Sequence, residues 1–197
     1  MYRPDTKPHK SIRLKGYDYS RPGAYFVTIC THNKECLFGS VMGENMVLSD
    51  FGRMVEVEWL KTAEIRKNVI LDVRVIMPNH FHGIVLITEK DSGKARLATT
   101  HGNVQTKMEF GKPQSGSLSA IVGSFKSSVA KQINLMRNTL GKEVWQRNYY
   151  ERIIRNPEEL QHIREYIIHN PLKWHLDRDN PVGIPDESEL KFWKEFL

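Results

Sequence analysis

The residues of this sequence with the clearest chemical potential are two histidines, His80 and His82, separated by one phenylalanine. They follow Pro78–Asn79, where two apolar runs meet at a turn. In a β-strand, side chains at positions i and i+2 point to the same side, so the two imidazoles would stand next to each other. Imidazole is a common metal ligand, and the pair can hold one divalent cation. The alternative is a pair of polar core residues whose ring N–H groups are satisfied by hydrogen bonds.

A tyrosine and an asparagine near the end of a predicted helix, Tyr166 and Asn170, extend this chemistry. Residues four apart in a helix project from the same edge. With an oxygen of Asn170 added to His80 and His82, the site has two nitrogens, one oxygen and open positions, which suits Mg²⁺ or Mn²⁺ acting on a phosphate. Tyr166 then lies close to that phosphate as a nucleophile, and its attack would leave a covalent phosphotyrosyl link to DNA.

Basic and aromatic side chains that could bind DNA are concentrated between residues 126 and 155. A lysine on the polar face of a helix can contact the phosphate backbone, and exposed aromatic rings can stack on bases. Packing under the last helix is the commoner fate of such rings. Tyr149 and Tyr150 are rival nucleophiles, but neither is followed by a possible metal ligand one helical turn later. The predicted DNA-binding residues are Lys126, Trp145, Arg147, Tyr149, Arg152 and Arg155.

The strands that must position the histidines are predicted from hydrophobic alternation. A β-branched and aromatic run predicts a strand over 24–31, and two further runs predict a strand hairpin over 68–88. In the second strand of that hairpin the two histidines share a face with Ile84 and Leu86, because side chains alternate with a period of two. The histidines are therefore expected on the same side of a sheet as part of the core.

Three helices are predicted from their caps and their apolar stripes. Ser49 can cap a helix over 50–66, and a second helix begins near Ser117. Asn156, with a proline directly after it and a glutamate three residues on, marks the start of a third. That helix ends at Asn170, because a residue before proline disfavours the helical conformation. The expected buried residues are Phe51, Val55, Trp59 and Ala63 in the first helix, Leu118, Ile121, Val122, Phe125, Val129, Ile133 and Met136 in the second, and Leu160, Ile163 and Ile167 in the third.

Length and composition favour one cytoplasmic domain with appendages. The chain has 197 residues, and 29 basic against 23 acidic side chains give a net charge of +6, which suits a polyanionic partner. Cys30 and Cys36 are too few for a disulfide framework and are expected to be reduced. Neither an export signal nor an apolar run long enough to span a membrane is recognisable. We expect a basic arm over 1–23, a domain over 24–175 with a flexible loop at about 89–116, and an amphipathic tail over 176–197 that must dock on the domain.

Several of these motifs occur together in an order that resembles the REP-associated tyrosine transposases, a branch of the single-tyrosine HUH nucleases. The resemblance covers about residues 24–174 and implies an α+β fold, namely a ferredoxin-like antiparallel sheet with helices packed on one face. It also implies a need for Mg²⁺ or Mn²⁺, held by His80, His82 and Asn170, and catalysis by Tyr166. The motifs that carry it are His80–Phe81–His82, Trp145–Gln146, Tyr149–Tyr150–Glu151, Ile154–Arg155–Asn156 and Tyr166–Ile167–Ile168–His169–Asn170–Pro171.

The function that this resemblance implies is cleavage and rejoining of single-stranded DNA at palindromic, REP-like hairpins through a covalent phosphotyrosine intermediate. Single-stranded DNA hairpins are then the partners of a cytoplasmic, nucleoid-associated enzyme that acts as a monomer or a homodimer, with no membrane involved. Two alternatives stay open. One is a module that binds single-stranded nucleic-acid hairpins without cleaving them. The other is a metal-dependent DNA hydrolase in which no covalent intermediate forms.

Overall fold

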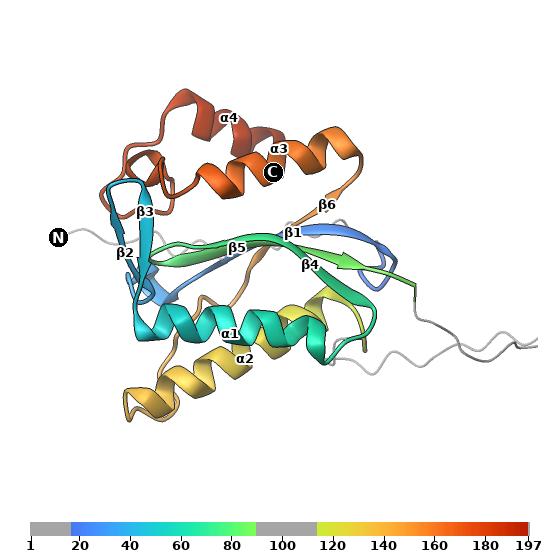
Figure 1. Cartoon of the computed structure of the whole chain (residues 1–197), viewed down its shortest axis with the longest axis horizontal. Helices are drawn as coiled ribbons and strands as arrows, with labels where there is room; N and C mark the ends of the chain where they lie inside the picture. Colours follow the sequence, from blue (N-terminus) through green and yellow to red (C-terminus); the bar gives the residue numbers. More distant parts are fainter. Residues whose placement is uncertain (1–16, 90–113, 197) are drawn as a thin grey trace, which may run out of the picture.

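A four-stranded antiparallel sheet is the centre of the fold (Figure 1). The computed structural model describes residues 17–89 and 114–196. The strand order is β4 (Val69–Ile76), β5 (His80–Ile87), β1 (Gly23–Cys30) and β6 (Tyr150–Ile154). With one helix between β1 and β4 and another between β5 and β6, this is the predicted ferredoxin-like α+β arrangement. The histidine-bearing strand β5 is therefore internal, paired on one side with β4 and on the other with β1.

Helices α1 (Asp50–Glu64) and α2 (Leu118–Met136) cover one face of the sheet, as predicted (Figure 1). The side chains of Ser49 and Ser117 accept hydrogen bonds from the first turns of these helices, which confirms both predicted caps. Aromatic rings fill the layer beneath. The Trp59 ring centroid lies 4.5 Å from that of Phe81 on β5 and 5.1 Å from that of Phe125 on α2. The predicted helix stripes are largely buried, apart from Met136, which lies half exposed at the end of α2.

Helices α3 (Pro157–His169) and α4 (Glu187–Phe196) form a second layer on the opposite face, which the expectation of helices on one face did not include (Figure 1). The physical reason is that this face of the sheet is also apolar. Phe26 and Ile84 lie on it and pack against Ile163 and Ile167 of α3. Strands that are covered on both sides bury nearly every residue, and β5 is buried along almost its whole length.

A bulge in β4 fixes α3 to the sheet. The pairing of β4 with β5 shifts by one residue between Leu71 and Arg74, so Leu71 faces α1 and α2 whereas Val73 faces α3. Asp72 lies at the bulge and accepts three hydrogen bonds from the Arg164 guanidinium of α3, at 3.3, 3.0 and 2.5 Å. This ion pair ties the middle of α3 to the edge strand.

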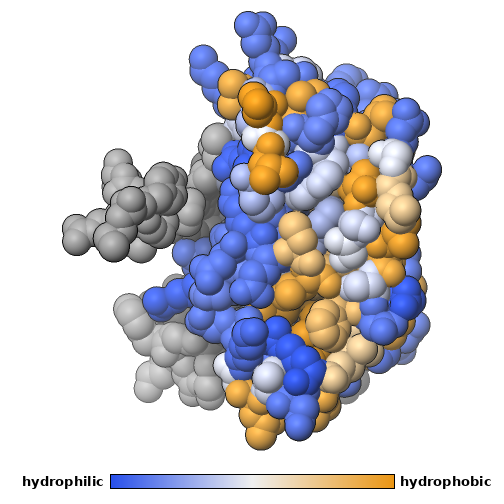
Figure 2. All heavy atoms as spheres, turned by 90° about the vertical axis from the view of Figure 1, so that its left-hand side faces the viewer, coloured by the Kyte–Doolittle hydropathy of each residue, from blue (hydrophilic) through white to orange (hydrophobic). Residues whose placement is uncertain are grey.

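Smaller elements close one end of the molecule. The strands β2 (Gly39–Met42) and β3 (Asn45–Leu48) form a separate hairpin, and the short 3₁₀ helices η1 (His32–Lys34) and η2 (Trp174–Leu176) lie in the connections. Figure 2 looks at this end and shows apolar side chains gathered on part of the surface beside a broad hydrophilic area. On the hairpin, Met42 and Val47 are exposed.

Some expectations fall on other parts of the chain. Most of the predicted basic arm over 1–23 and of the loop at about 89–116 lies outside the described residues. Within the described ranges, no helix has the length and apolar character needed to cross a membrane.

Candidate metal and nucleophile site

The two histidines stand side by side on β5, as the alternation predicted. His80 pairs with Cys30 and His82 with Thr28 across the β1–β5 ladder. Their ring centroids are 4.5 Å apart, and neither side chain is exposed to solvent. Both rings point to the face of the sheet that α3 and α4 cover, and the His82 ring stacks on Phe26 of that face.

Hydrogen bonds orient both imidazoles for metal binding. The Nδ2 of Asn79 donates to the backbone carbonyls of Lys34 and Asp179, so its Oδ1 is left to accept from Nδ1 of His80 at 2.9 Å. A neutral His80 ring that donates from Nδ1 carries its lone pair on Nε2. The Nδ1 of His82 is hydrogen-bonded to the Thr28 hydroxyl at 2.7 Å. Such partners on the remote nitrogen are the usual support of a metal-ligating histidine.

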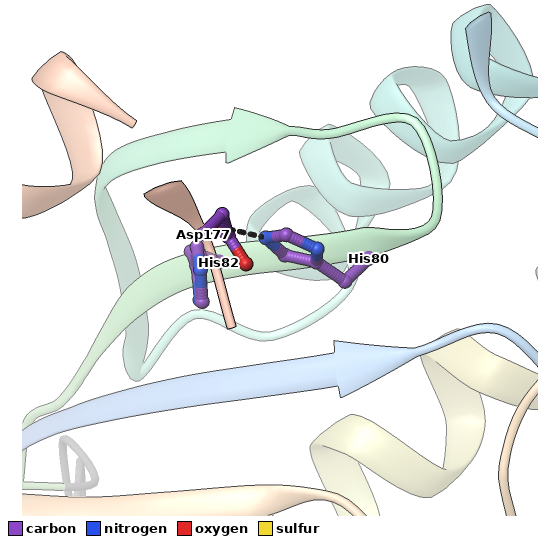
Figure 3. A group of neighbouring side chains, drawn as sticks. All are labelled: His80, His82 and Asp177. Atoms are coloured by element: carbon purple, nitrogen blue, oxygen red, sulfur yellow. Dashed lines mark ion pairs between the residues drawn. The ribbon is translucent and has the colours of Figure 1, made fainter. Parts of the chain in front are cut away.

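Asp177 completes a group that can hold a metal ion (Figure 3). Its Oδ2 lies 3.6 Å from Nε2 of His80, and one ligand atom from each of His80, His82 and Asp177 lies within 4.8 Å of the others. All three side chains are buried. A carboxylate in such a place is costly unless a cation neutralises it, and a divalent ion between the three atoms would do so.

The unsatisfied polar atoms of this region support the same interpretation. Nε2 of His80, Nε2 of His82 and Oδ2 of Asp177 are buried and have no hydrogen-bond partner in the described part of the chain. Oδ1 of Asn170, the C-cap residue of α3, has the same property. Buried polar atoms nearly always have partners, and a metal ion is a partner that these four atoms could share. Two imidazole nitrogens with carboxylate and amide oxygens form a donor set that Mg²⁺ or Mn²⁺ accepts.

Tyr166 lies beside the histidines and is held by α4. Its ring centroid is 5.5 Å from that of His82, and its ring stacks on Phe192 at 3.7 Å with an angle of 9°. The hydroxyl donates to Oε1 of Glu189 at 3.2 Å. The indole Nε1 of Trp193 donates to the Tyr166 oxygen at 3.2 Å and to Glu189 Oε1 at 2.7 Å.

This environment favours the neutral phenol. Burial, followed by the negative charges of Asp177 and Glu189, raises the pKa of Tyr166 far above its ordinary value. Burial, followed by the charge of Asp177, also raises the pKa of Glu189. A cleft of about 300 Å³ between α3 and α4 reaches Tyr166, Asn170 and Glu189. Solvent or a ligand can therefore approach Tyr166 from the α3–α4 side.

Two of the predicted DNA-binding residues are used inside the fold instead. Trp145 is almost fully buried and packs on Phe38 and Phe125, with ring centroids 5.1 and 6.0 Å apart, so it offers no open face to a base. Lys126 donates from Nζ to the carbonyls of Gln146 at 2.7 Å and Arg147 at 3.1 Å. Its ammonium thus holds a turn of the chain, and burial lowers its pKa to about 8. The sequence could not distinguish these roles from DNA contacts.

The other predicted DNA-binding residues lie along and before the edge strand β6. Arg147 and Arg155 are exposed, and they lie in the sequence just before and just after β6. Arg152 is paired with Glu159 of α3 at 2.5 Å. Tyr149 is partly buried against the core under α1 and α2. The DNA-binding role of these four residues stays a prediction.

Sequence reasoning missed three residues of the site, Asp177, Glu189 and Trp193. All three belong to the segment that was expected only to dock as an amphipathic tail. That tail does dock, because Phe192 and Trp193 are buried against the sheet face that carries Phe26. The closeness of Asp177 to the Asn170–Pro171 helix end was the available signal, but an acidic residue in a loop is usually solvated.

Comparisons with known proteins place the chain in a family. No protein-family model matches it. A protein of Haemophilus influenzae that is described as uncharacterized is 40% identical over 177 residues, which cover 90% of this chain and 96% of that protein. The chain belongs to the same family. Shared identity at this level over nearly the full length of both chains implies that the family has the fold described above.

Solved structures extend the comparison. A REP-associated tyrosine transposase, solved bound to a REP hairpin, matches with a TM-score of 0.55 and 19% identity over 82% of this chain and 73% of that one. A candidate transposase from Deinococcus radiodurans matches with a TM-score of 0.44 and 12% identity over 79% of this chain and 95% of that one. The first match confirms, at the level of fold, the resemblance to the REP-associated tyrosine transposases.

Proposed function

We propose that this protein is a metal-dependent endonuclease and strand transferase that acts on single-stranded DNA at palindromic, REP-like hairpins. The observation that carries the proposal is the position of Tyr166. Its hydroxyl donates a hydrogen bond to the Glu189 carboxylate, and its ring lies beside His82, whose buried Nε2 has no hydrogen-bond partner in the described part of the chain. The shared fold of a transposase solved with a REP hairpin supports the choice of substrate.

His80, His82 and Asp177 would hold the ion, with Asn170 as a further oxygen ligand. We propose Mg²⁺ or Mn²⁺, because both ions accept this mixed nitrogen and oxygen donor set. When bound, a divalent cation polarises a phosphodiester and stabilises the charge that develops on its oxygens. His80 and His82 are buried and are oriented by Asn79 and Thr28, so the two imidazoles need little rearrangement to bind it.

Tyr166, Glu189 and Trp193 have separate roles in the proposed transfer of the DNA phosphate to the protein. The Tyr166 oxygen forms a bond to phosphorus while the bond from phosphorus to the 3′ oxygen breaks, and the energy of the phosphodiester is kept in the phosphotyrosyl link. The phenol must lose its proton in this step. Glu189, which already accepts the hydrogen bond of Tyr166, takes the proton and can return it to the departing 3′ oxygen. Trp193 holds the two oxygens together by donating to both.

The chain segments and the cellular setting form part of the same proposal. We propose that the segment after residue 175 belongs to the catalytic domain, since it supplies Asp177 and Glu189. The enzyme would act in the cytoplasm on nucleoid DNA, as a monomer or a homodimer.

A binding module without cleavage is the second candidate function. Tyr166 is stacked beneath Phe192 and its hydroxyl is engaged by two partners, an arrangement that also suits a residue that only packs. A hydrolase without a covalent intermediate would use the same metal ligands but would leave Tyr166 unmodified.

One experiment separates the three. The purified protein is incubated with labelled single-stranded hairpin oligonucleotides from the DNA that flanks its gene, with Mn²⁺ or with EDTA, and run on a denaturing gel. A metal-dependent slow band that Tyr166→Phe abolishes supports the proposal. Tyr19→Phe, which removes a hydroxyl on the α1–α2 side, is the matched control and should leave the band unchanged. Cleaved DNA without a slow band indicates a hydrolase, and retarded DNA on a native gel without cleavage indicates a binding module.

A further inference from the structure

Arg178 is a cation that the proposed chemistry has not yet used. It directly follows the metal-site residue Asp177, and its side chain is exposed. The two neighbouring carboxylates are directed elsewhere, because Asp177 faces His80 and Asp179 pairs with Lys34 at 3.2 Å. Arg178 forms no ion pair with any residue of the described ranges, so its charge is available to an anion.

The guanidinium is fixed over the residue that supports the nucleophile. The guanidinium carbon of Arg178 lies 4.4 Å from the ring centroid of Trp193. The edge of the same indole donates to the Tyr166 oxygen and to Glu189. The backbone N–H of Arg178 also donates to Glu189 Oε1 at 3.4 Å. One indole ring therefore separates a fixed positive charge from the attacking oxygen.

The edge strand β6 brings more positive charge to the same place. The ring of Tyr150 meets Trp193 edge-on, with centroids 5.1 Å apart and an angle of 88°. Burial raises the pKa of Tyr150 to about 12, and the charges of Arg178 and Arg152 act in the opposite direction. The Tyr150 phenol thus lies in the field of both arginines. Arg152 is paired with Glu159, so Arg178 is the better placed of the two to bind an anion.

We propose that Arg178 binds a backbone phosphate of the DNA strand next to the scissile bond and so positions that bond over Tyr166. A guanidinium stacked on an indole keeps its N–H edges free, and those edges match two oxygens of a phosphate. The weak hydration of the guanidinium and its contact with the ring lower the cost of fixing it there. The inference rests on the proposed function for the identity of the polyanion, and it makes Arg178 a positioning residue.

Binding to modified DNA tests this role separately from cleavage. Two proteins that both carry Tyr166→Phe are compared, one with Arg178 and one with Arg178→Gln. The affinity of each for the hairpin oligonucleotide is measured. Each phosphate within two nucleotides of the cut is replaced in turn by a neutral methylphosphonate. We expect Arg178→Gln to weaken binding of unmodified DNA by about 10- to 100-fold, the typical effect of losing a hydrogen bond to a charged group. At one phosphate, the methylphosphonate should weaken binding to the Arg178 protein but not to Arg178→Gln.

Two further variants separate phosphate binding from packing on Trp193. Arg178→Lys keeps the charge but loses the bidentate edge, so it should recover only part of the affinity. Arg53→Gln removes an equal charge from α1 on the opposite side of the sheet and should leave the phosphate-by-phosphate pattern unchanged. If each methylphosphonate weakens DNA binding by the same factor in the Arg178 protein and in the Arg178→Gln protein, the proposal is wrong. That outcome can occur with the covalent Tyr166 band intact, so it is distinct from failure of the proposed function.

Discussion

A metal ion bound by His80, His82 and Asp177 should stabilise the fold, and the stabilisation can be measured without DNA. The ligand atoms are buried on two separate parts of the structure, the strand β5 and the segment after η2, so they come together only in the folded chain. An ion that binds the folded state alone, present at about 100 times its dissociation constant, stabilises that state by about 2.7 kcal/mol. For a domain of this size this corresponds to a rise in Tm of roughly 5 to 11 °C.

Asp177→Asn should remove most of this effect. If the loss of the carboxylate weakens the affinity for Mn²⁺ about 100-fold, the same Mn²⁺ concentration equals the new dissociation constant. The ion then stabilises the folded state by only about 0.4 kcal/mol. The expected rise in Tm then falls to roughly 1 to 2 °C. The assay is thermal unfolding, followed by circular dichroism, of protein that has been treated with EDTA, dialysed and titrated with Mn²⁺.

Asp72→Asn is the matched control for this experiment. Asp72 is a partly buried carboxylate that pairs with Arg164 at the β4 bulge, away from the histidines. Its loss should lower the Tm of the apo protein but leave the Mn²⁺-dependent rise intact. The reasoning is refuted if Asp177→Asn keeps the full rise, or if the wild-type protein shows none at millimolar Mn²⁺.

Three further predictions concern the residues around this site. Glu189→Gln should slow formation of the covalent band about 100-fold at saturating DNA, as expected for loss of a general base, and an unchanged single-turnover rate would exclude that role. Burial, followed by the charges of His80 and Arg178, lowers the pKa of His82 well below 6.5, so the unfolded state takes up a proton first. The free energy of unfolding in EDTA should therefore fall as the pH drops below about 6.5, by up to about 1.4 kcal/mol per pH unit from this group, and denaturant titrations of His82→Gln should show a weaker dependence. Lys126→Met should lower the free energy of unfolding by about 1 to 3 kcal/mol, since it leaves backbone carbonyls without their donor, while hairpin affinity in a gel-shift assay stays within a few-fold.

Local sequence patterns predicted the parts of the site that lie close together in the chain. A period of two is enough to place His80 and His82 on one face of a strand, and the caps at Ser49, Ser117 and Asn156 are confirmed because each bonds to a residue three positions on. The same patterns could not show which face of the sheet each helix covers. That choice depends on packing between segments far apart in the chain.

The residues that the sequence did not reveal are those whose environment is set by long-range packing. Asp177 resembles an ordinary solvated loop carboxylate until η2 brings it to His80. Trp145 and Lys126 resemble nucleic-acid contacts until the core encloses the indole and three carbonyls surround the ammonium. Each of these residue types suits a surface role as well as a role inside the fold. Only the burial of the side chain in the structure distinguishes the two.

The most direct test of covalent catalysis is mass spectrometry of the protein after reaction with the hairpin oligonucleotide and digestion of the DNA. Trypsin would place Tyr166 in the peptide Glu165–Lys173 and the rival tyrosines Tyr149 and Tyr150 in the peptide Asn148–Arg152. The account predicts a nucleotide adduct on the first peptide, present with Mn²⁺ and absent with EDTA. An adduct on the second peptide, or cleaved DNA with no adduct on either, would contradict it.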